Sequence, residues 1–402
     1  MHYPAPGQEF PDYPCYRLDI FTQARLRRDK MSSSSVLIAG IVVSAGIIAF
    51  NSSGCAAAGN KGTEGKSGVT IYKQEKCYHS YTLYSSRQTE EANLIDMEGN
   101  IVHRWSYPQG YTWHYAELLP NGHLCAIIKE SEPKITGMLI ELDWENNLVR
   151  RIDVPAHHDF EKLENGNIMA LCREYVSNEA VHSDDTKSDY YVEITPDDET
   201  VWEWHTDKHA LKLKNFVELQ FPRKERDWAH TNTVEVLPDN PLAKEDTRFR
   251  KGNVLFSMRN VDTIGVIDKE TGEVVWAWGP GVLDKQHMPT MLDNGNILVY
   301  DNGTARKYTR ILEIKPLTGE IVWEYKADPP ESFFSPTRGS NQRLPNGNTF
   351  IAESDSGRLF EVTPEGEMVW EFFNPDLTKA GKRMPLYRSM RYSPEFIGRL
   401  MK

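Results

Sequence analysis

The sequence predicts an all-β protein: a six-bladed β-propeller with four-stranded blades, preceded by a signal or anchor segment. A pattern of about 47 residues recurs six times between residue 94 and the C-terminus. Each copy carries a signal for one hairpin and most carry a signal for a second, and two hairpins supply the four strands of one propeller blade. Hydrophobic residues make up 39% and aromatic residues 11% of the 402 positions, which is enough to form a large core.

A valine marks the outer hairpin of each copy, in a strand that alternates large apolar and polar residues, as in TVWEW and VVWAW. The separations between successive valines are 47, 52, 74, 47 and 47 residues. The six valines are Val102, Val149, Val201, Val275, Val322 and Val369. An aromatic residue, often Trp, stands one or three positions after five of the six valines, the exception being Val149. We therefore expect the valine and tryptophan faces to pack between neighbouring blades.

Asn-Gly turns mark the second hairpin, as in LLPNGHL and MLDNGNILVY, because Asn and Gly supply the positive φ angles of tight turns. We expect residues 79–86 and 386–393 to complete one blade together, which closes the ring and leaves no long exposed sheet edge. The longest separation contains an insert at residues 206–226. Its segment 208–221 has a helix-compatible pattern and is predicted to form a cap over one end of the ring. The propeller domain is assigned to residues 71–402.

Residues 1–70 are expected to form a signal or anchor segment and a flexible tether. Residues 36–50 are uncharged and apolar and follow a basic cluster at 25–30, which is typical of a signal sequence. As a helix they rise about 22 Å, less than the roughly 30 Å of a bilayer core, so cleavage or a short anchor is favoured over a spanning helix. The Gly54-Cys55 pair suggests a lipid-modified cysteine. We predict an extracytoplasmic location, either periplasmic or membrane-anchored.

Charge and cysteine usage exclude several classes of function. The formal net charge is −12, whereas binding to nucleic acid needs a basic surface. The five cysteines, at positions 15, 55, 77, 125 and 172, show no CxxC spacing. Neither a metal knuckle nor a disulfide scaffold is indicated, although one bridge remains open. We expect no cofactor and no metal.

Histidines recur at equivalent positions just upstream of the turn that follows the inner strand. The candidates His114, His158, His230, His287 and Arg338 stand five, five, seven, five and six residues before the leucine that opens this turn. The innermost strands of a propeller line its central channel, so these side chains should converge there. A single histidine in such a strand more often has a structural role than a catalytic one, and this applies to His114 when it is considered by itself. Asn302, in the segment DNG, is expected either to contact substrate at the channel floor or to form a plain turn.

Clustered neutral imidazoles can support several kinds of chemistry. One is nucleophilic catalysis, in which a histidine nitrogen carries the transferred group covalently while its neighbours act as general acid and base. Arg259, on the strand after the third inner turn, is placed to hold the oxygens of an anionic group. A second possibility is an open zinc site with three His ligands. A third is a propeller without catalytic activity that binds a ligand or protein.

The sequence resembles the PAPS-independent aryl-sulfate sulfotransferases, the arylsulfotransferase family, over residues 94–373. The motifs that carry the resemblance are HHDFEKLENGNIMAL (157–171), WAHTNTVEVLPDN (228–240), LFSMRN (255–260) and QHMPTMLDNGNILVYDNG (286–303). Members of this family are six-bladed propellers that transfer a sulfuryl group between phenols through a sulfohistidine. By motif position, the resemblance implies that His287 is the nucleophile, His158 and His230 support it, and Arg259 binds sulfate.

The resemblance also implies the partners, which are small-molecule aryl sulfates and phenols. Residues 56–93 are too short for the additional N-terminal β domain through which some members dimerise, so the oligomeric state stays open. The WxW hairpins with TGE turns also resemble quinone-dependent dehydrogenase propellers. That alternative requires eight blades, and the six repeats argue against it.

Overall fold

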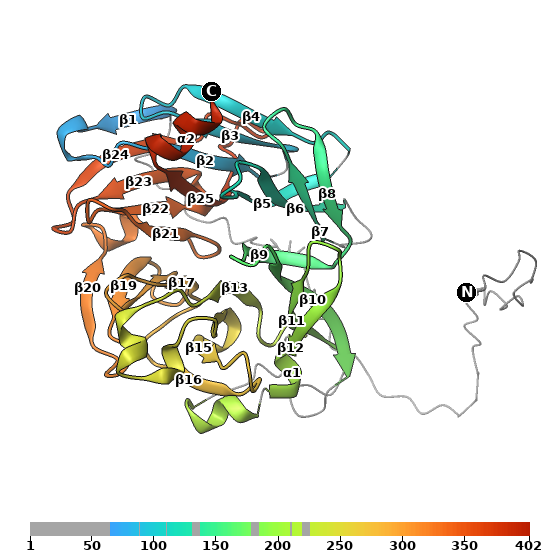
Figure 1. The fold of residues 1–402 in the computed structure, drawn as a ribbon. Coiled ribbons are helices and arrows are strands. Elements are labelled where there is room, and N and C mark those ends of the chain that lie inside the picture. Colours follow the sequence, from blue (N-terminus) through green and yellow to red (C-terminus); the bar gives the residue numbers. More distant parts are fainter. Residues whose placement is uncertain are drawn as a thin grey trace, which may run out of the picture. The chain divides into compact units, whose positions relative to one another are not determined.

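Six antiparallel sheets are arranged radially around a common centre, as the repeat predicts (Figure 1). The computed structural model describes residues 65–402 apart from 88, 110, 131–136, 178–184, 210 and 219–225. The apolar segment 36–50 and Cys55 lie outside the described residues. Within the part of the chain that is described, no helix is long and apolar enough to cross a membrane.

Each blade has four strands, of which the first named here is the innermost (Figure 1). The first blade contains β25 (Leu386–Tyr392), β2 (Tyr81–Ser86), β3 (Glu91–Ile95) and β4 (Ile101–Ser106). The second contains β5 (Tyr111–Leu118), β6 (Leu124–Glu130), β7 (Gly137–Leu142) and β8 (Leu148–Ile152). The third contains β9 (Ala156–Lys162), β10 (Ile168–Ser177), β11 (Asp185–Ile194) and β12 (Thr200–His205).

The other three blades follow the same order. The fourth contains β13 (Thr231–Val236), β14 (Val254–Met258), β15 (Thr263–Ile267) and β16 (Val274–Trp278). The fifth contains β17 (His287–Met291), β18 (Ile297–Asp301), β19 (Arg310–Ile314) and β20 (Ile321–Tyr325). The sixth contains β21 (Ser340–Arg343), β22 (Thr349–Glu353), β23 (Arg358–Val362) and β24 (Met368–Phe373), and β1 (Gly68–Tyr72) pairs with β24 as a fifth strand.

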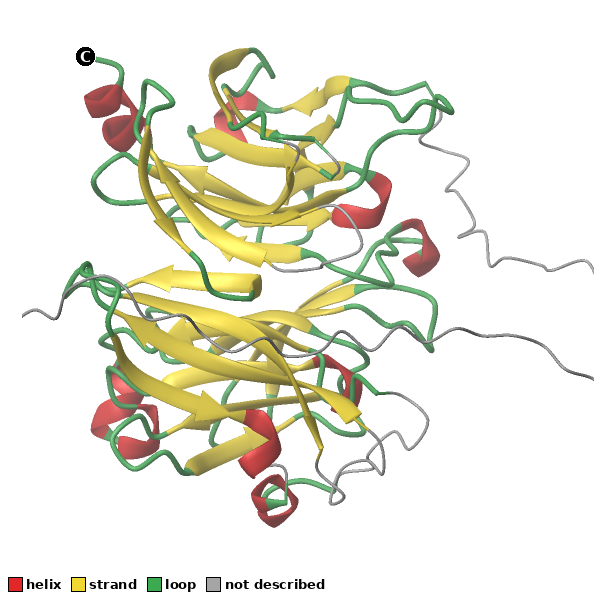
Figure 2. Cartoon of the chain, turned by 90° about the vertical axis from the view of Figure 1, so that its right-hand side faces the viewer, coloured by secondary structure: helices red, strands yellow, loops and turns green. Residues whose placement is uncertain are grey.

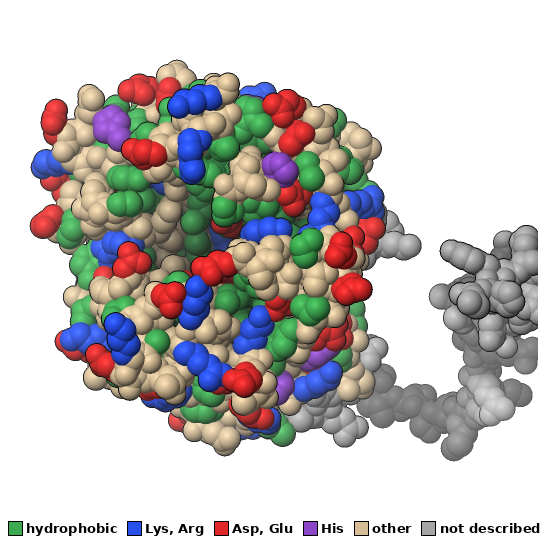
Figure 3. All heavy atoms as spheres, viewed as in Figure 1, with side chains coloured by type: hydrophobic (Ala, Val, Ile, Leu, Met, Phe, Trp, Pro, Cys, Tyr) green, Lys and Arg blue, Asp and Glu red, His purple; other side chains and the backbone are tan. Residues whose placement is uncertain are grey.

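The ring closes between the two ends of the propeller. β2 pairs with β25 in antiparallel register, from Tyr81 opposite Tyr392 to Ser86 opposite Leu386, as predicted. The six inner strands also contact one another in a complete circle, from β5 through β9, β13, β17 and β21 to β25 and back to β5. Side chains on these strands therefore share one central channel, and Figure 3 shows a hollow at the centre of the ring.

Tryptophans of the outermost strands join each blade to the next. Each indole Nε1 donates a hydrogen bond to a backbone carbonyl in a turn of the following blade. These bonds run from Trp105 to Asp143 (3.1 Å), Trp204 to Gly272 (2.9 Å), Trp276 to Pro316 (3.2 Å), Trp323 to Pro364 (2.7 Å) and Trp370 to Met97 (2.8 Å). In the second blade Arg150 replaces Trp and donates to the carbonyl of Thr195. Three of the six valines are less buried than expected, since Val149, Val201 and Val322 are 49%, 54% and 39% exposed, whereas Val369 is fully buried.

Helices are short and few among the described residues, and they lie around the sheets (Figure 2). The α-helices are α1 (Thr206–His209) and α2 (Pro394–Leu400). The 3₁₀ turns are η1 (Gln74–Lys76), η2 (Lys212–Asn215), η3 (Pro241–Lys244), η4 (Thr247–Phe249), η5 (Arg259–Val261), η6 (Pro330–Ser332) and η7 (Ser354–Ser356). The predicted cap is wrong for the described part of the insert. There η2 contacts β16, an outermost strand, because Leu213 is fully buried against the blade core.

Candidate active site

The inner strands are irregular where they carry the candidate histidines. The pairing of β9 with β10 shifts next to His158, whose φ is 65°, and that of β17 with β18 shifts at Met288, whose φ is 43°. His230 precedes β13 with φ 48°. A bulge re-aims a side chain, and non-glycine residues with positive φ are uncommon outside functional sites. The distortion therefore coincides with the residues that the repeat singled out.

Two of the predicted histidines, His114 and His230, lie on either side of a third, His158. Its ring centroid lies 5.2 Å from that of His114 and 5.0 Å from that of His230, both in edge-on geometry. The phenol ring of Tyr387, on β25, lies 4.2 Å from the imidazole of His114 and 5.9 Å from that of His158. Side chains from the first four blades thus form one cluster, which ring closure brings together from positions 114 to 387.

His157 lies behind His158 and fixes its tautomer. The Nε2 of His157 lies 3.0 Å from Asp189 Oδ1 and 3.2 Å from the carbonyl of Cys172, so this nitrogen must be the donor. Its Nδ1 therefore carries a lone pair and accepts the contact from Nδ1 of His158. His158 in turn keeps its proton on Nδ1. Its Nε2 is left as an acceptor for a group in the channel.

Asp189 and Asp227 are the carboxylates of this cluster. Burial of Asp189 opposes ionisation, but the nearby His157 and Arg173 outweigh it and hold the pKa of Asp189 below its usual range. Asp227 Oδ2 accepts a 2.8 Å hydrogen bond from Nδ1 of His230. Burial also opposes ionisation of Asp227, and the contact with His230 lowers its pKa. Each carboxylate can therefore stabilise positive charge on an imidazole.

His287 is held by Asn302 in one defined tautomer. Both hydrogens of the Asn302 amide are used, because Nδ2 lies 2.7 Å from the carbonyl of Ser335 and 2.6 Å from that of Arg338. The amide oxygen must therefore face His287, whose Nδ1 lies 2.7 Å away and donates to it. The Nε2 of His287 is left with its lone pair. These contacts make Asn302 a residue that positions His287 rather than a channel-floor residue with a free amide.

Arg259 lies near His287, whereas Arg338 contacts the asparagine that positions this ring. The charge of Arg259 is, after burial, the largest contribution that lowers the pKa of His287, which places the guanidinium close to this ring. Arg259 also donates to Asn260 Oδ1 at 2.9 Å. Arg338 forms an ion pair with Asp355, and its backbone carbonyl anchors Asn302. Charge on His230 also lowers the pKa of His287, so the two rings lie within electrostatic reach of each other.

The imidazoles of His114, His157, His158 and His287 are neutral at physiological pH. Burial, reinforced by neighbouring imidazoles, lowers the pKa of His158 well below its usual range. Burial and then the charge of Lys129 do the same to His114. Burial and then Arg173 lower the pKa of His157 to about 4. Neutral nitrogens with a free lone pair are the form that a nucleophile or a general base requires.

Sequence reasoning missed four residues of this site: His157, Asp189, Asp227 and Tyr387. Alignment of β25 with the other inner strands would have found Tyr387. Asp227 stands three residues before His230, a spacing that could have drawn attention. Asp189 lies on β11, a strand that the repeat places away from the channel, so no pattern pointed to it. His157 directly precedes His158 in the HHDF segment, and both take part.

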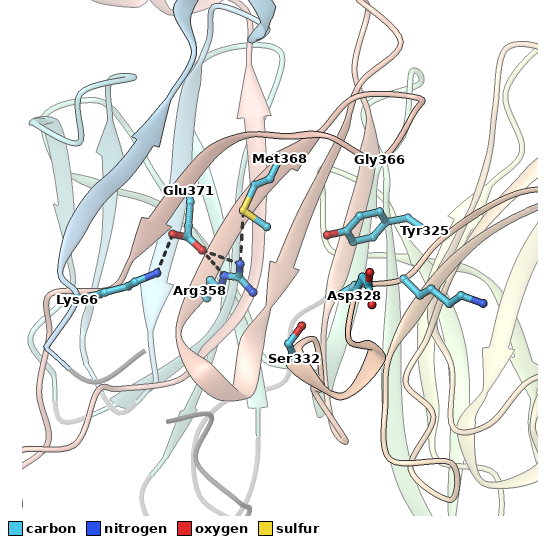
Figure 4. A pocket seen from close by; sticks show the side chains of 10 residues that line it. Lys66, Tyr325, Asp328, Ser332, Arg358, Gly366, Met368 and Glu371 are labelled. Carbon is cyan, nitrogen blue, oxygen red and sulfur yellow. Dashed lines mark hydrogen bonds and ion pairs between the residues drawn. The ribbon is translucent and has the colours of Figure 1, made fainter. Parts of the chain in front are cut away.

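The pocket between the fifth and sixth blades and the group of possible metal ligands contain none of the channel histidines. A pocket of about 430 Å³ lies between the fifth and sixth blades (Figure 4). Three of its charged side chains pair with one another, Arg358 with Glu371 at 2.6 Å and Lys66 with Glu371 at 3.4 Å. Among the described residues, the side chains close enough together to hold a metal ion are Glu174, His205 and Asp207. That group contains none of the channel histidines.

The fold and the site define a β-propeller whose central channel carries neutral imidazoles, carboxylates and guanidinium groups. A family model, Arylsulfotransferase (ASST), matches residues 116–375, which is more than half of the chain. The chain therefore belongs to the arylsulfotransferase family, as its motifs indicated. The match includes His158, His230 and His287 and ends before Tyr387.

Solved structures are similar in fold but distant in sequence. A protein of unknown function from Bacteroides caccae is 14% identical with a TM-score of 0.52, over 78% of this chain and 99% of that one. A catalytically inactive virginiamycin B lyase from Staphylococcus aureus, solved with quinupristin, is 13% identical with a TM-score of 0.40, over 67% and 72% of the two chains. The Kuenenia stuttgartiensis hydrazine synthase is 11% identical with a TM-score of 0.45, over 74% and 76%. No curated protein matches the chain.

Proposed function

We propose that this protein transfers a sulfuryl group from an aryl sulfate to a phenol, without PAPS, through a sulfohistidine on His287. The observation that carries the proposal is the Asn302 clamp. It holds a buried, neutral imidazole with its Nδ1–H donated away and its Nε2 lone pair available. Membership of the arylsulfotransferase family supports the same reaction class.

In the first half-reaction, Nε2 of His287 attacks the sulfur atom of the donor. The N–S bond forms as the bond from sulfur to the aryl oxygen breaks, and Arg259 stabilises the charge on the sulfonate oxygens. The leaving phenolate takes a proton from His230. Asp227, 2.8 Å from Nδ1 of His230, stabilises the imidazolium that donates it. The site then holds sulfo-His287 and a neutral His230.

In the second half-reaction, the oxygen of an acceptor phenol attacks the same sulfur atom and the N–S bond breaks. The Nε2 of His158 accepts the phenol proton, since the contact with His157 leaves this nitrogen as an acceptor. The proton then passes to the adjacent ring of His230, whose centroid lies 5.0 Å away. Protons and charge balance over the cycle, and the site returns to its starting state.

The test is mass spectrometry of the protein after incubation with para-nitrophenyl sulfate. The expected result is the added mass of one SO₃ on His287, stable in alkaline quench, labile in acid and removed by phenol. His287→Ala should lose both the adduct and transfer. His123→Gln is a matched control, because His123 pairs with Glu141 at 2.6 Å in a turn of the second blade. An unmodified wild-type protein that also releases no para-nitrophenol would favour a propeller that only binds ligands.

A further inference from the structure

Two cations approach the channel without an ionic partner. Lys129 on β6 is opposite Thr112 of β5, two residues before His114. Arg87 follows β2, where its backbone N–H donates to the carbonyl of Pro385. No carboxylate of the described residues forms an ion pair with either side chain. By contrast, Arg338 forms an ion pair with Asp355, which neutralises its charge.

Both charges are partly withdrawn from water and act on the same imidazole. After burial, Lys129 and Arg87 are the two largest contributions that lower the pKa of His114. Burial, Arg173 and Arg87 lower the pKa of Lys129 to about 8, and burial and Arg338 lower that of Arg87. The Nε2 of His114 is buried and has no hydrogen-bond partner among the described residues. A half-buried pair of unpaired cations is costly unless an anion compensates it.

Lys129 and Arg87 lie away from the place where the sulfuryl group is proposed to bind, at His287 and Arg259. Lys129 and Arg87 belong to the first and second blades, whereas Arg259 and His287 belong to the fourth and fifth. In a ring of six, these pairs of blades face each other across the channel, as β2 and β6 face β13 and β17 in Figure 1. An anion held by Lys129 and Arg87 is therefore a second anionic group, on the far side of an aromatic ring whose sulfate ester meets His287.

We propose that Arg87 and Lys129, with His114, bind a second anionic group of the substrate. The inference rests on the proposed function and names its substrate class: phenols and aryl sulfates that carry a carboxylate or a similar anion. A neutral phenol fills the ring position but leaves both cations unpaired. A cationic phenol meets repulsion, so discrimination has both an attractive and a repulsive component.

The test compares three acceptors with para-nitrophenyl sulfate as the donor: para-hydroxyphenylacetate, para-hydroxyphenylacetamide and tyramine. The wild type should prefer the anion over its amide isostere in kcat/KM and should use tyramine least. Lys129→Met and Arg87→Met should each reduce the preference for the anion on the order of tenfold, with little change for the amide. Lys129→Arg, which keeps the positive charge, should retain the preference for the anion. Lys379→Met, which removes a charge from an exposed turn, should leave the preference unchanged.

Several outcomes would overturn the inference. Equal use of the acid and the amide by the wild type rejects it. A loss of the same factor for all acceptors in Lys129→Met, with the thermal unfolding midpoint unchanged, assigns the lysine to the sulfuryl group instead. If no donor is turned over, the proposed reaction fails. Calorimetry then decides the subsite separately: binding of para-hydroxyphenylacetate that depends on Lys129 supports it, and binding that does not depend on Lys129 rejects it.

Discussion

Three inner strands have a histidine in their first half or just before their start and a glutamate further along, and the two sets of side chains are held in different ways. The histidine level consists of His114, His158 and His230, and the glutamate level consists of Glu117, Glu161 and Glu235. At the histidine level, His158 and His230 use one nitrogen for a partner behind the ring and present the other to the channel. At the glutamate level, carboxyl oxygens accept backbone N–H groups of the next inner strand, Glu161 from Val236 and Glu235 from Met291.

Burial shifts the pKa values of the three glutamates and of His158 in opposite directions, and in both cases it favours the uncharged form. It raises the pKa of Glu117 to about 7 and that of Glu161 to about 8, and it raises the pKa of Glu235 well above its usual range. It lowers the pKa of His158. Glu161 and Glu235 therefore connect neighbouring blades, whereas His158 keeps an unused lone pair. The same strands thus contain a structural level and a chemical level, and substitutions should separate them.

The largest expected effect comes from a pair of substitutions close together on the chain, at and just before β13. His230→Gln removes the group that we assign as proton donor, and should lower kcat for transfer on the order of 10²- to 10⁴-fold with little change in stability. Glu235→Gln keeps the shape of the protonated carboxyl and an acceptor for the N–H of Met291, and should leave kcat within about twofold. Steady-state assays and chemical denaturation measure both. Loss of activity in Glu235→Gln with the fold intact would show that the two levels are not separate.

A second substitution addresses the clamp on His287. Asn302→Leu removes the acceptor for Nδ1, so the proton is no longer confined to that nitrogen and Nε2 loses its fixed lone pair. We expect kcat to fall on the order of 10²-fold and the sulfohistidine to form correspondingly slowly. Asn348→Leu is the control, because Asn348 is also buried but bonds to Lys76 and Glu361 away from the histidines. Equal losses in the two variants would mean that the effect is one of folding.

The sequence predicted the structural parts of this comparison better than the chemical ones. A period of about 47 residues was enough for the ring, its closure and the inner position of His158 and His230, because those follow from repetition. The tryptophan bonds between blades were not foreseen, and neither was the use of Arg150 in place of Trp, because a single repeat does not reveal its neighbour. Asp189 was missed since it approaches from a second strand. The insert was misplaced because helix-compatible spacing does not say which surface buries Leu213.

A smaller effect is expected from Asp189, which acts on the channel only through His157. Asp189→Asn removes the carboxylate that accepts from Nε2 of His157 and leaves the Cys172 carbonyl to hold this proton, so the tautomers of His157 and His158 are less firmly fixed. Transfer from sulfo-His287 to phenol should slow about tenfold, while formation of the sulfohistidine should change little. The pH profile of the second half-reaction should also shift. Single-turnover measurements separate the two steps, and equal slowing of both would contradict a role confined to His158.

The smallest effect is in the pH dependence of stability, where a buried glutamate and a buried histidine of the same strand should have opposite slopes. The pKa of Glu161 is raised to about 8 in the folded state, so its contribution is complete below its unfolded pKa and is lost as the pH rises through about 8. The pKa of His157 is lowered to about 4, so folding is penalised below this value and the penalty disappears as the pH rises toward the ordinary pKa of histidine.

Both residues lie on β9, which makes them a matched pair for measurement of the free energy of unfolding by urea between pH 4 and 9. Glu161→Gln should flatten the decline on the alkaline side, and His157→Gln should flatten the rise on the acidic side, each on the order of 1 kcal/mol. Glu164→Gln, at an exposed position of the following turn, should change neither slope. If both variants altered the same side of the profile, burial would not be keeping the two levels neutral in opposite ways, and the division of the inner strands into a structural and a chemical level would lose its electrostatic basis.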